Sequence, residues 1–305
     1  MRSLLLILAV ASIAALLMCS GDGSEQITGV TAGGDDDNHN GDSLPPPATV
    51  VIRVPADQPT IQAGIDSASV GDTVLVADGV YTDDGNRDIE FGGRSIVLMS
   101  EDGASHTIID CGGDPLNLHA GFNVSMASES LLVIDGFTIR GGYHSQGVAI
   151  NFRSAGPLIK NCVLADNVGM ISGGAIRCKS ASPTFENCTF VGNSAPTGAI
   201  AYLLGGSSPR FINCILAYST GGDIIECSGN DDLPDLDCSN IYSNEGGDWI
   251  GCLTNLSSIQ GNMSADPLFC DWGAGDYHLQ SASPCVAENN SCNVTIGALG
   301  TGCSQ

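Results

Sequence analysis

A 26-residue repeat constrains what this chain can fold into more than any other feature of its sequence. The segment from Gly147 to Cys162 (GVAINFRSAGPLIKNC) recurs from Gly173 to Cys188 (GGAIRCKSASPTFENC), and its second half returns as SSPRFINC, which ends at Cys214. Repeats of this size cannot bury an apolar side alone, so they stack as turns of a solenoid. β-Branched and aromatic residues, without any 3.6-residue period, indicate strands rather than helices. The repeat therefore predicts an all-β, parallel β-helix.

The repeat also predicts which side chains line up in columns along the solenoid. Strand alternation directs Phe185, Cys188 and Phe190 inward, and Thr189 and Val191 outward. The inward cysteines of successive repeats are Cys162, Cys188 and Cys214. We expect this column to consist of small buried residues. No histidine lies near it and one column cannot supply tetrahedral geometry, so we expect no zinc site there.

An asparagine precedes each of these cysteines. Alternation breaks at Asn187, because Asn tolerates the left-handed backbone that bends one short strand into the next. We expect the asparagines of successive repeats to form a ladder of side-chain hydrogen bonds along the solenoid. This ladder would contain Asn161, Asn187 and Asn213.

Weaker copies extend the solenoid in both directions, to about seven or eight coils. VIDGFTIRGG (133–142) has the same shape upstream, and LDCSNIYSN (236–244) resembles the repeat downstream with its cysteine shifted. At the front, PTIQAGIDSA predicts a short capping helix with Thr60 as its N-cap and with Ile61 and Ile65 on one side. The β-helix domain then spans residues 48–305.

The register disappears from about Gly246, in a stretch rich in Gly, Asn and Ser. Five cysteines punctuate this stretch, namely Cys252, Cys270, Cys285, Cys292 and Cys303. They predict an irregular C-terminal cap held by disulfides. Twelve cysteines remain besides Cys19, an even number that suits pairing in an oxidising compartment.

Residues 1–19 read as a signal peptide, because Arg2 is followed by an apolar run that is too short for an ordinary membrane span. The run ends in Leu16-Leu17-Met18-Cys19, which resembles the bacterial lipobox, so Cys19 is the predicted lipidation site. Met18 stands where that motif prefers a small residue, and plain secretion is the alternative. Residues 20–47 are polar and acidic, and they predict a disordered linker.

The net charge of −24 at pH 7 excludes some partners. Such a surface repels phosphate backbones, so we expect no nucleic-acid partner. A membrane would be contacted only through the N-terminal lipid. The expected location is extracellular or on a bacterial cell surface, where an outer-membrane lipoprotein is one option.

With these residues described, the opening PTIQAGIDSASVGDTVLVADGVYTD and the Asn- and Cys-marked coils resemble the right-handed β-helix proteins of the pectate-lyase-like superfamily. More narrowly, the chain resembles secreted bacterial β-helix repeat proteins of unassigned function. The resemblance covers residues 50–303 and implies a right-handed fold. It implies no single activity, because this scaffold carries lyases, hydrolases, epimerases and adhesins.

The catalytic residue sets of those enzymes are incomplete here. The segment Gly229–Leu236 (GNDDLPDL) resembles a calcium-binding loop of one β-helical pectate lyase family, but Leu233 replaces a glycine and no Lys or Arg follows Arg210 as a base. A turn at Asn230–Pro234 followed by the next coil explains the same residues, and we favour it. The Gly-His-Gly and Arg-Ile-Lys motifs of polygalacturonases are absent. The catalytic residues, if any, are therefore unknown.

One cluster of cations remains as a candidate site. In the 26-residue register Arg153 falls beside Lys179 on an outward face, with Arg177 nearby. These residues could bind the carboxylate or hydroxyl groups of a sugar, with Tyr143 and Tyr202 as the nearest aromatics, or they could merely keep an outer face hydrated. No metal ligands are predicted.

Two functions follow from these observations. The favoured one is a non-catalytic surface β-helix, which binds a polysaccharide or surface glycan or serves as a structural or adhesive module. It would need no cofactor, although calcium is an option. The alternative is a divergent calcium-dependent, pectate-type polysaccharide lyase.

Overall fold

A computed structural model describes residues 49–125, 131–257 and 259–303. The predicted signal peptide, the lipidation site Cys19 and the predicted linker lie outside the described residues. The description that follows concerns the unit formed by residues 48–305.

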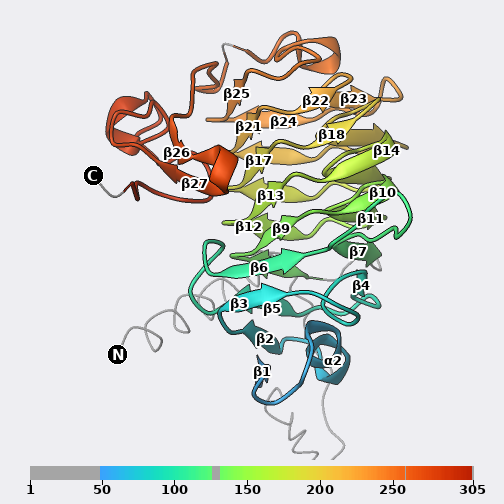
Figure 1. Cartoon of the computed structure of the whole chain (residues 1–305). Helices are drawn as coiled ribbons and strands as arrows, with labels where there is room; N and C mark the ends of the chain where they lie inside the picture. Colours follow the sequence, from blue (N-terminus) through green and yellow to red (C-terminus); the bar gives the residue numbers. More distant parts are fainter. Residues whose placement is uncertain (1–48, 126–130, 258, 304–305) are drawn as a thin grey trace, which may run out of the picture. The chain divides into compact units, whose positions relative to one another are not determined.

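Short parallel strands stack into four sheets, A to D (Figure 1). Each turn of the chain is here called a rung. The rungs from β8 to β23 visit the sheets in the order A, B, C, D, whereas the earlier rungs have no strand in sheet C. Sheet A contains β1 (Val51–Val54), β2 (Thr73–Val76), β5 (Val97–Ser100), β8 (Val133–Asp135), β12 (Leu158–Lys160), β16 (Thr184–Glu186), β20 (Arg210–Ile212) and β24 (Asp235–Asp237). Sheet B contains β3 (Gly79–Tyr81), β6 (Thr107–Asp110), β9 (Thr138–Arg140), β13 (Val163–Ala165), β17 (Thr189–Val191), β21 (Ile215–Ala217) and β25 (Asn240–Tyr242).

The other two sheets begin later along the chain. Sheet C contains β10 (Tyr143–Gln146), β14 (Val168–Ser172), β18 (Ser194–Ala195) and β22 (Thr220–Gly221). Sheet D contains β4 (Ile89–Glu90), β7 (Phe122–Ser125), β11 (Ile150–Arg153), β15 (Ile176–Lys179), β19 (Ala201–Leu204) and β23 (Ile225–Cys227). This arrangement is a parallel β-helix of about seven turns, which confirms the predicted fold class.

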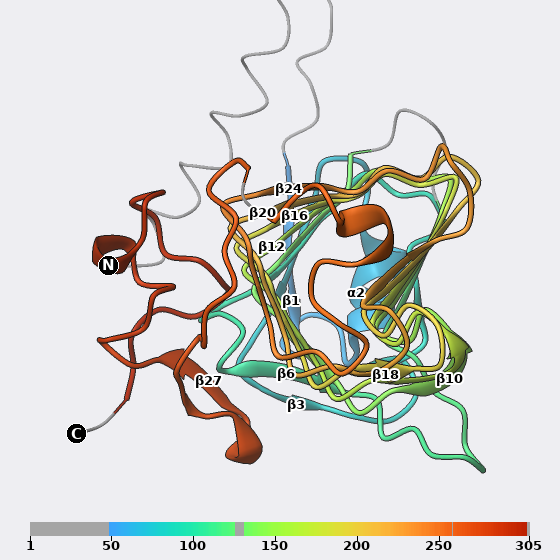
Figure 2. The ribbon, with the colours of Figure 1, turned by 90° about the horizontal axis from the view of Figure 1, so that it is seen from above.

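The direction of winding follows from the view along the axis (Figure 2). Figure 1 shows that the chain rises from β1 to β25, and Figure 2 looks down from above. In that view the strands of sheet A, such as β12 and β16, lie at the upper left, those of sheet B at the bottom, and those of sheet C, such as β18, at the lower right, and the chain visits these sheets in that order. A path that turns counter-clockwise while it approaches the viewer is right-handed.

The core consists of the inward columns that the repeat predicts. Phe185, Cys188 and Phe190 are all buried without exposed surface. Phe185 stacks on Phe211 of the next rung, with ring centroids 5.2 Å apart and an interplanar angle of 12°. Phe190 meets Phe185 edge-on at 5.3 Å. Burial of each such ring stabilises the fold by roughly 1.5–3 kcal/mol, so the repeated inward aromatics fix the register between rungs.

The asparagine and cysteine columns lie where the repeat predicts them. The backbones of Asn161, Asn187 and Asn213 are left-handed, with φ of 52°, 49° and 53°. The amide of Asn213 donates to Oδ1 of Asn187 at 3.1 Å, whereas that of Asn161 donates to Oδ1 of Asp135 at 2.7 Å. The cysteine column is fully buried and consists of Cys162, Cys188 and Cys214.

The helix α2 (Ile61–Ser67) closes the lower end of the β-helix, as predicted. The Oγ1 of Thr60 accepts a hydrogen bond from the backbone N–H of Ala63 at 3.2 Å, which is the expected N-cap. Ile61 and Ile65 are fully buried. A Cβ on Gly64 would approach Val54 and Val74 to 2.9 Å, so this glycine lets the helix lie close against the first rungs.

The C-terminal region consists of two parts with different positions. Residues 246–257, which include the 3₁₀ helix η1 (Gly251–Leu253), cover the upper end of the core, where Leu253 is fully buried. Trp249, Cys252 and Leu256 pack against the same core.

Residues 263–303, here called the return segment, pack against the outside of sheet B (Figure 1). This segment contains the antiparallel strands β26 (Phe269–Asp271) and β27 (Asp276–Leu279) and the 3₁₀ helices η2 (Trp272–Ala274) and η3 (Ala287–Asn289). It forms a second apolar core with outward residues of β13, β17 and β21, namely Val163, Ala165, Val191, Ile215 and Ala217. Thr189 and Val191 thus point outward, as predicted, yet they are buried.

Three disulfides hold the C-terminal region, and they join Cys227 to Cys252, Cys238 to Cys292, and Cys270 to Cys303. Cys285 departs from the expectation, because it is a free thiol buried in the second core. Of the described cysteines, six are free and buried, so the even number of cysteines does not reflect complete pairing. The three disulfides indicate an oxidising, extracellular environment.

Candidate functional site

The register places Arg153 of β11 directly beside Lys179 of β15, on the outer face of sheet D. Both side chains are exposed. Adjacent strands of a sheet are ~4.8 Å apart, so the two cations lie one rung apart, as their 26-residue spacing suggested.

Arg177 lies two residues before Lys179 on the same strand and therefore on the same face. Burial lowers the pKa of its guanidinium, and the positive charge of Arg153 lowers it further. A Cβ on Gly147 would lie 2.6 Å from the Cβ of Arg177, so the glycine permits the chain to pass close to this side chain. Arg153, Arg177 and Lys179 are here called the cation triad.

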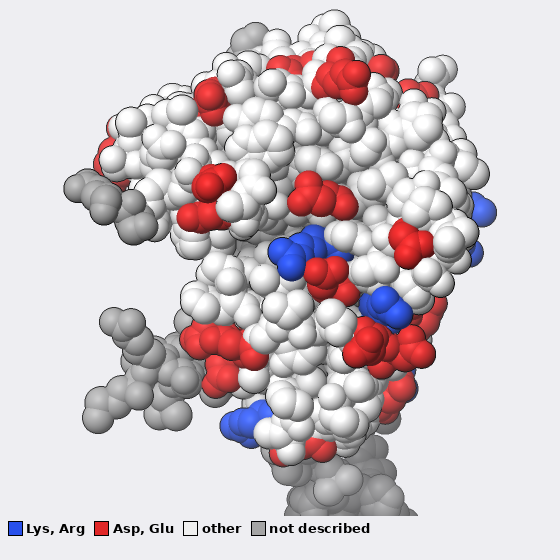
Figure 3. Space-filling view, viewed as in Figure 1, with Lys and Arg blue, Asp and Glu red and all other residues white. Residues whose placement is uncertain are grey.

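The members of the cation triad lack acidic partners, a feature that they share only with Arg53 among the described Lys and Arg residues. Five other cations form ion pairs with carboxylates, namely Arg87, Arg94, Arg140, Lys160 and Arg210. Among the residues that the structure describes, no carboxylate lies within ion-pair distance of any member of the triad. Acidic side chains outnumber basic ones on the molecular face in Figure 3, as the net charge of −24 requires. Like charges on neighbouring strands repel, and the charge of Arg153 lowers the pKa of Arg177, so this arrangement favours an anionic or strongly hydrogen-bonding ligand.

Amide side chains extend the face below the triad. Asn123 and Asn151 occupy the same outward column as Arg177, and Nδ2 of Asn151 donates to Oδ1 of Asn123 at 3.2 Å. Oδ1 of Asn151 and Nε of Arg177 are buried, and neither has a hydrogen-bond partner among the described residues. Neither asparagine was predicted as a site residue, although the 26-residue offset from Arg177 leads directly to Asn151.

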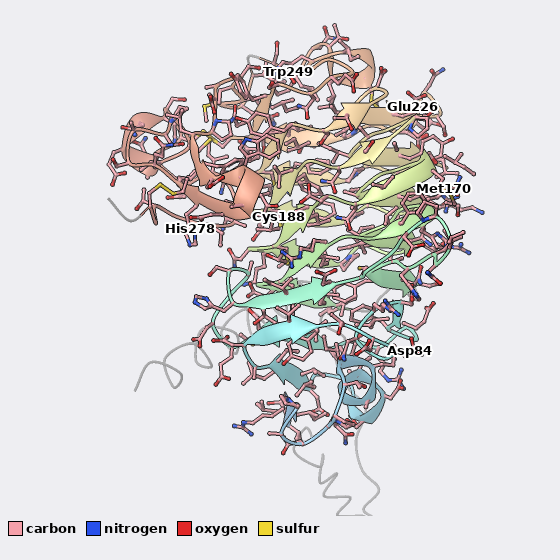
Figure 4. The ribbon with its side chains drawn as sticks, viewed as in Figure 1. Asp84, Met170, Cys188, Glu226, Trp249 and His278 are labelled. Carbon is pink, nitrogen blue, oxygen red and sulfur yellow. A yellow bond between two sulfur atoms is a disulfide. The ribbon has the colours of Figure 1, made fainter. Side chains whose placement is uncertain are left out.

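A glutamate lies at each end of this column. Glu90 lies at the lower end, in register with Asn123. Burial raises the pKa of Glu90, while the charge of Arg153 and a hydrogen bond with Asn123 lower it. Glu226 lies at the upper end, above Tyr202, and Figure 4 labels it near the top of the β-helix.

Of the two aromatic candidates for sugar stacking, the structure brings one to the triad. Tyr202 is in register with Arg177 on sheet D. Tyr143 lies on β10 of sheet C and is therefore not part of this face.

A pocket of about 430 Å³ adjoins the upper end of sheet D, where Glu226, Asp232 and Leu233 contribute to its lining. The loop that resembles a calcium site therefore borders a cavity. However, the Asp232 carboxylate accepts hydrogen bonds from the Ser207 N–H at 2.8 Å and from the Ser228 hydroxyl at 3.3 Å. Asp235 pairs with Arg210 at 3.1 Å. The loop thus acts as a turn, and two of its carboxylates already have protein partners.

Searches for similar proteins add no identification. No family model matches the chain, and no curated protein matches it. Within the described ranges, no three His, Cys, Asp or Glu side chains are grouped so as to hold a metal ion. None of the described helices has the length and apolar character needed to cross a membrane.

Proposed function

We propose that this protein is a non-catalytic β-helix of the extracellular space or cell surface, which binds an acidic or hydroxyl-rich glycan along the outer face of sheet D. The observation that carries this proposal is the cation triad, in which three cations without ion-pair partners among the described residues gather on adjacent strands of an acidic protein. Guanidinium and ammonium groups form charge-assisted hydrogen bonds with carboxylates and hydroxyls.

The shape of the face favours a polysaccharide over other anionic polymers. Rungs repeat every ~4.8 Å, so the face offers a regular series of side chains to a ligand that is itself a chain of repeated units. Asn151 and Tyr202 flank Arg177 and supply an amide and an aromatic ring on successive rungs. Glu90 and Glu226 bound the column at its ends, so the acidic groups of a bound glycan would lie on the central rungs between them.

The spacing of the acids supports binding rather than glycoside hydrolysis. Glu90 and Glu226 are separated by five strand steps in sheet D, or roughly 24 Å. Paired catalytic carboxylates of glycosidases lie only about 5–10 Å apart. The two acids are therefore too far apart to act on one glycosidic bond.

The proposal also includes a lipid anchor that attaches the protein to a membrane and a relationship to a known superfamily. The lipobox-like residues that end at Cys19 support a lipid anchor, with residues 20–47 as the linker to the β-helix. The opening PTIQAGIDSA motif and the Asn-marked rungs support a relationship to the pectate-lyase-like superfamily. In that setting the protein would act as a glycan-binding or adhesive module on a bacterial surface.

A glycan array followed by calorimetry tests the proposal. R153A/K179A should weaken binding of an acidic glycan at least tenfold, because each charge-assisted contact contributes about 1.5–3 kcal/mol. R53A/R210A is the matched control, since it removes two cations that lie outside sheet D, and it should bind like the wild type. Equal losses in both variants, or no loss in the first, would overturn the proposal. Unsaturated products from uronate polymers with calcium would identify a lyase instead.

A further inference from the structure

Tyr218 has a backbone conformation that is unfavourable for an aromatic residue. It occupies the left-handed turn that follows sheet B, where successive rungs have Asp166, Gly192, Tyr218 and Ser243 with φ of 53°, 64°, 56° and 56°. Asp and Gly adopt this conformation readily, whereas a bulky residue there is uncommon. A strained residue at the surface suggests that its side chain is held in place for a purpose.

The ring of Tyr218 is fixed on three sides by contacts with other side chains. It stacks on Trp272 of the return segment, with centroids 4.9 Å apart and an interplanar angle of 11°. Tyr242 meets it edge-on at 5.9 Å. The Tyr218 hydroxyl donates to Oδ1 of Asp266 at 2.9 Å.

Trp272 lies on the outside of this stack, and 46% of its surface is exposed. Because Tyr218 covers one face of the indole, this exposed surface belongs to the rest of the residue, which includes the opposite face and the ring edge. The backbone on both sides of Trp272 is fixed by a hydrogen bond and a disulfide. Oδ1 of Asp271 accepts from the N–H of Ala274 at 3.2 Å, and the neighbouring Cys270 is bonded to Cys303. The result is a rigid, flat aromatic platform.

Two carboxylates belong to the surroundings of this platform. Asp266 and Asp271 are both exposed. Oδ2 of Asp266 has no hydrogen-bond partner within the described part of the chain, whereas Oδ1 also accepts from the N–H of Leu268 at 2.9 Å. Free carboxylate oxygens accept hydrogen bonds from hydroxyl or ammonium groups, and they repel anions.

We propose that Trp272 and Tyr218 form a second binding site, which takes a neutral or amino-sugar ring. The C–H face of a pyranose would lie on the open face of Trp272, and its hydroxyl or ammonium groups would donate to Asp266 and Asp271. This site is independent of the cation triad, because Tyr218 follows β21 of sheet B whereas the triad lies on sheet D. The two sites also select opposite ligand charges.

Fluorescence provides a direct test, since the chain contains only two tryptophans. Trp249 packs against the core and donates to Ser264, so W249F leaves Trp272 as the single reporter. Titration of W249F with neutral and amino-sugar oligosaccharides should give a saturable change in emission. By calorimetry, W272A should bind the same oligosaccharide about tenfold more weakly than W249F, and W272F should lie between them.

Controls separate this site from the cation triad and from loss of folding. R153A/K179A should retain full affinity for the neutral oligosaccharide, whatever its affinity for acidic glycans. W272F keeps an aromatic ring in the stack, and its melting temperature reports on folding. The proposal is overturned if W249F shows no saturable response to any of these sugars, or if W272A binds as well as W249F. Self-association that disappears in W272A would identify a protein contact instead and would equally overturn it.

Discussion

The side-chain amide of Asn167 donates a hydrogen bond to Oδ1 of Asn193 on the next rung, 3.1 Å away, and neither residue has surface exposed to solvent. The same oxygen accepts from the backbone N–H of Asn167 at 3.2 Å. Nδ2 of Asn193 in turn donates to the carbonyl of Leu164 at 2.8 Å. At the turn between sheets B and C, the strands leave some backbone N–H and C=O groups without partners. The side chains of this buried pair supply hydrogen-bond partners for those groups.

N193A should destabilise the protein by about 2–4 kcal/mol, because it leaves buried donors and acceptors of Asn167 and Leu164 without partners. Equilibrium unfolding in urea measures this loss. N187G is the matched control in the other asparagine column. Its amide is only partly buried, and glycine accepts the left-handed backbone, so a loss below about 1 kcal/mol is expected. Similar losses for both variants would contradict the role given to the buried pair.

The cysteine column should accept serine but not a larger residue. Sγ of Cys188 lies 3.5 Å from the carbonyl of Ile159 and 3.4 Å from that of Glu186. Ser239 continues the same column two rungs above, where its hydroxyl donates to the carbonyl of Phe211 at 3.1 Å.

C188S should therefore cost about 1 kcal/mol or less, since its hydroxyl can bond the same carbonyls. C188L should cost roughly 1–3 kcal/mol, because the column has no room for added methylenes. Urea denaturation compares the two variants with the wild type. A greater loss for C188S than for C188L would show that the thiols do more than fill space.

The Cys238–Cys292 disulfide should hold the return segment against the β-helix. It closes a span of 54 residues, for which chain entropy predicts about 4 kcal/mol of stabilisation. In C238S/C292S we expect a lower melting temperature and faster proteolysis within residues 263–303. C227S/C252S is the control, because its disulfide spans 25 residues and fastens the end of the core instead. If both variants release the return segment at the same rate, the assignment of these roles is incorrect.

Asp166 should make stability depend on pH. Burial raises the pKa of its carboxyl, against weaker lowering by a hydrogen bond from Tyr277 and by the charge of Arg140. A raised folded-state pKa means that the protonated form is preferred in the fold. The contribution of protonated Asp166 to the free energy of unfolding is fully present below the ordinary pKa of Asp. This contribution is lost as the pH rises through the raised value.

D166N removes this titration and can still accept a hydrogen bond from Tyr277. Its melting temperature should exceed that of the wild type at pH 7, and the difference should shrink as the pH falls towards 4. D110N tests a carboxylate that forms an ion pair with Arg140 at 3.0 Å, and it should instead lower stability at pH 7. A difference for D166N that does not change with pH would rule out this origin.

The sequence predicts the repeated part of the fold because each rung obeys one local pattern. The spacing of Cys162 and Cys188 gives the register, and the same spacing brings Arg153 beside Lys179. The shifted cysteine of the last copy is Cys238, and the structure explains the shift. Cys238 occupies the left-handed position that Asn213 has one rung below, with φ of 46°, and it is therefore available to Cys292 on the outside.

The return segment could not be predicted, because its contacts have no period. Tyr277 reaches Asp166 across 111 residues, and Ala298 donates to Thr189 across 109. A signal was nevertheless present in the outward residues of sheet B. Val163, Val191 and Ile215 are apolar although they point away from the core, and an apolar outward column indicates that another segment covers it.

The position of the return segment has a consequence for how this molecule can change in length. It packs on the outer faces of β13, β17 and β21, and it is joined to the β-helix near β25 by the Cys238–Cys292 disulfide and the bridge between Asn240 and Met263. The strands β3, β6 and β9 of sheet B lie below these contacts. Duplication or loss of a whole repeat below β13 would leave these strands in register with the return segment, whereas the same event between β13 and β25 would shift them relative to it. Whole repeats can therefore be added to the β-helix on the N-terminal side of β13 without displacing the return segment.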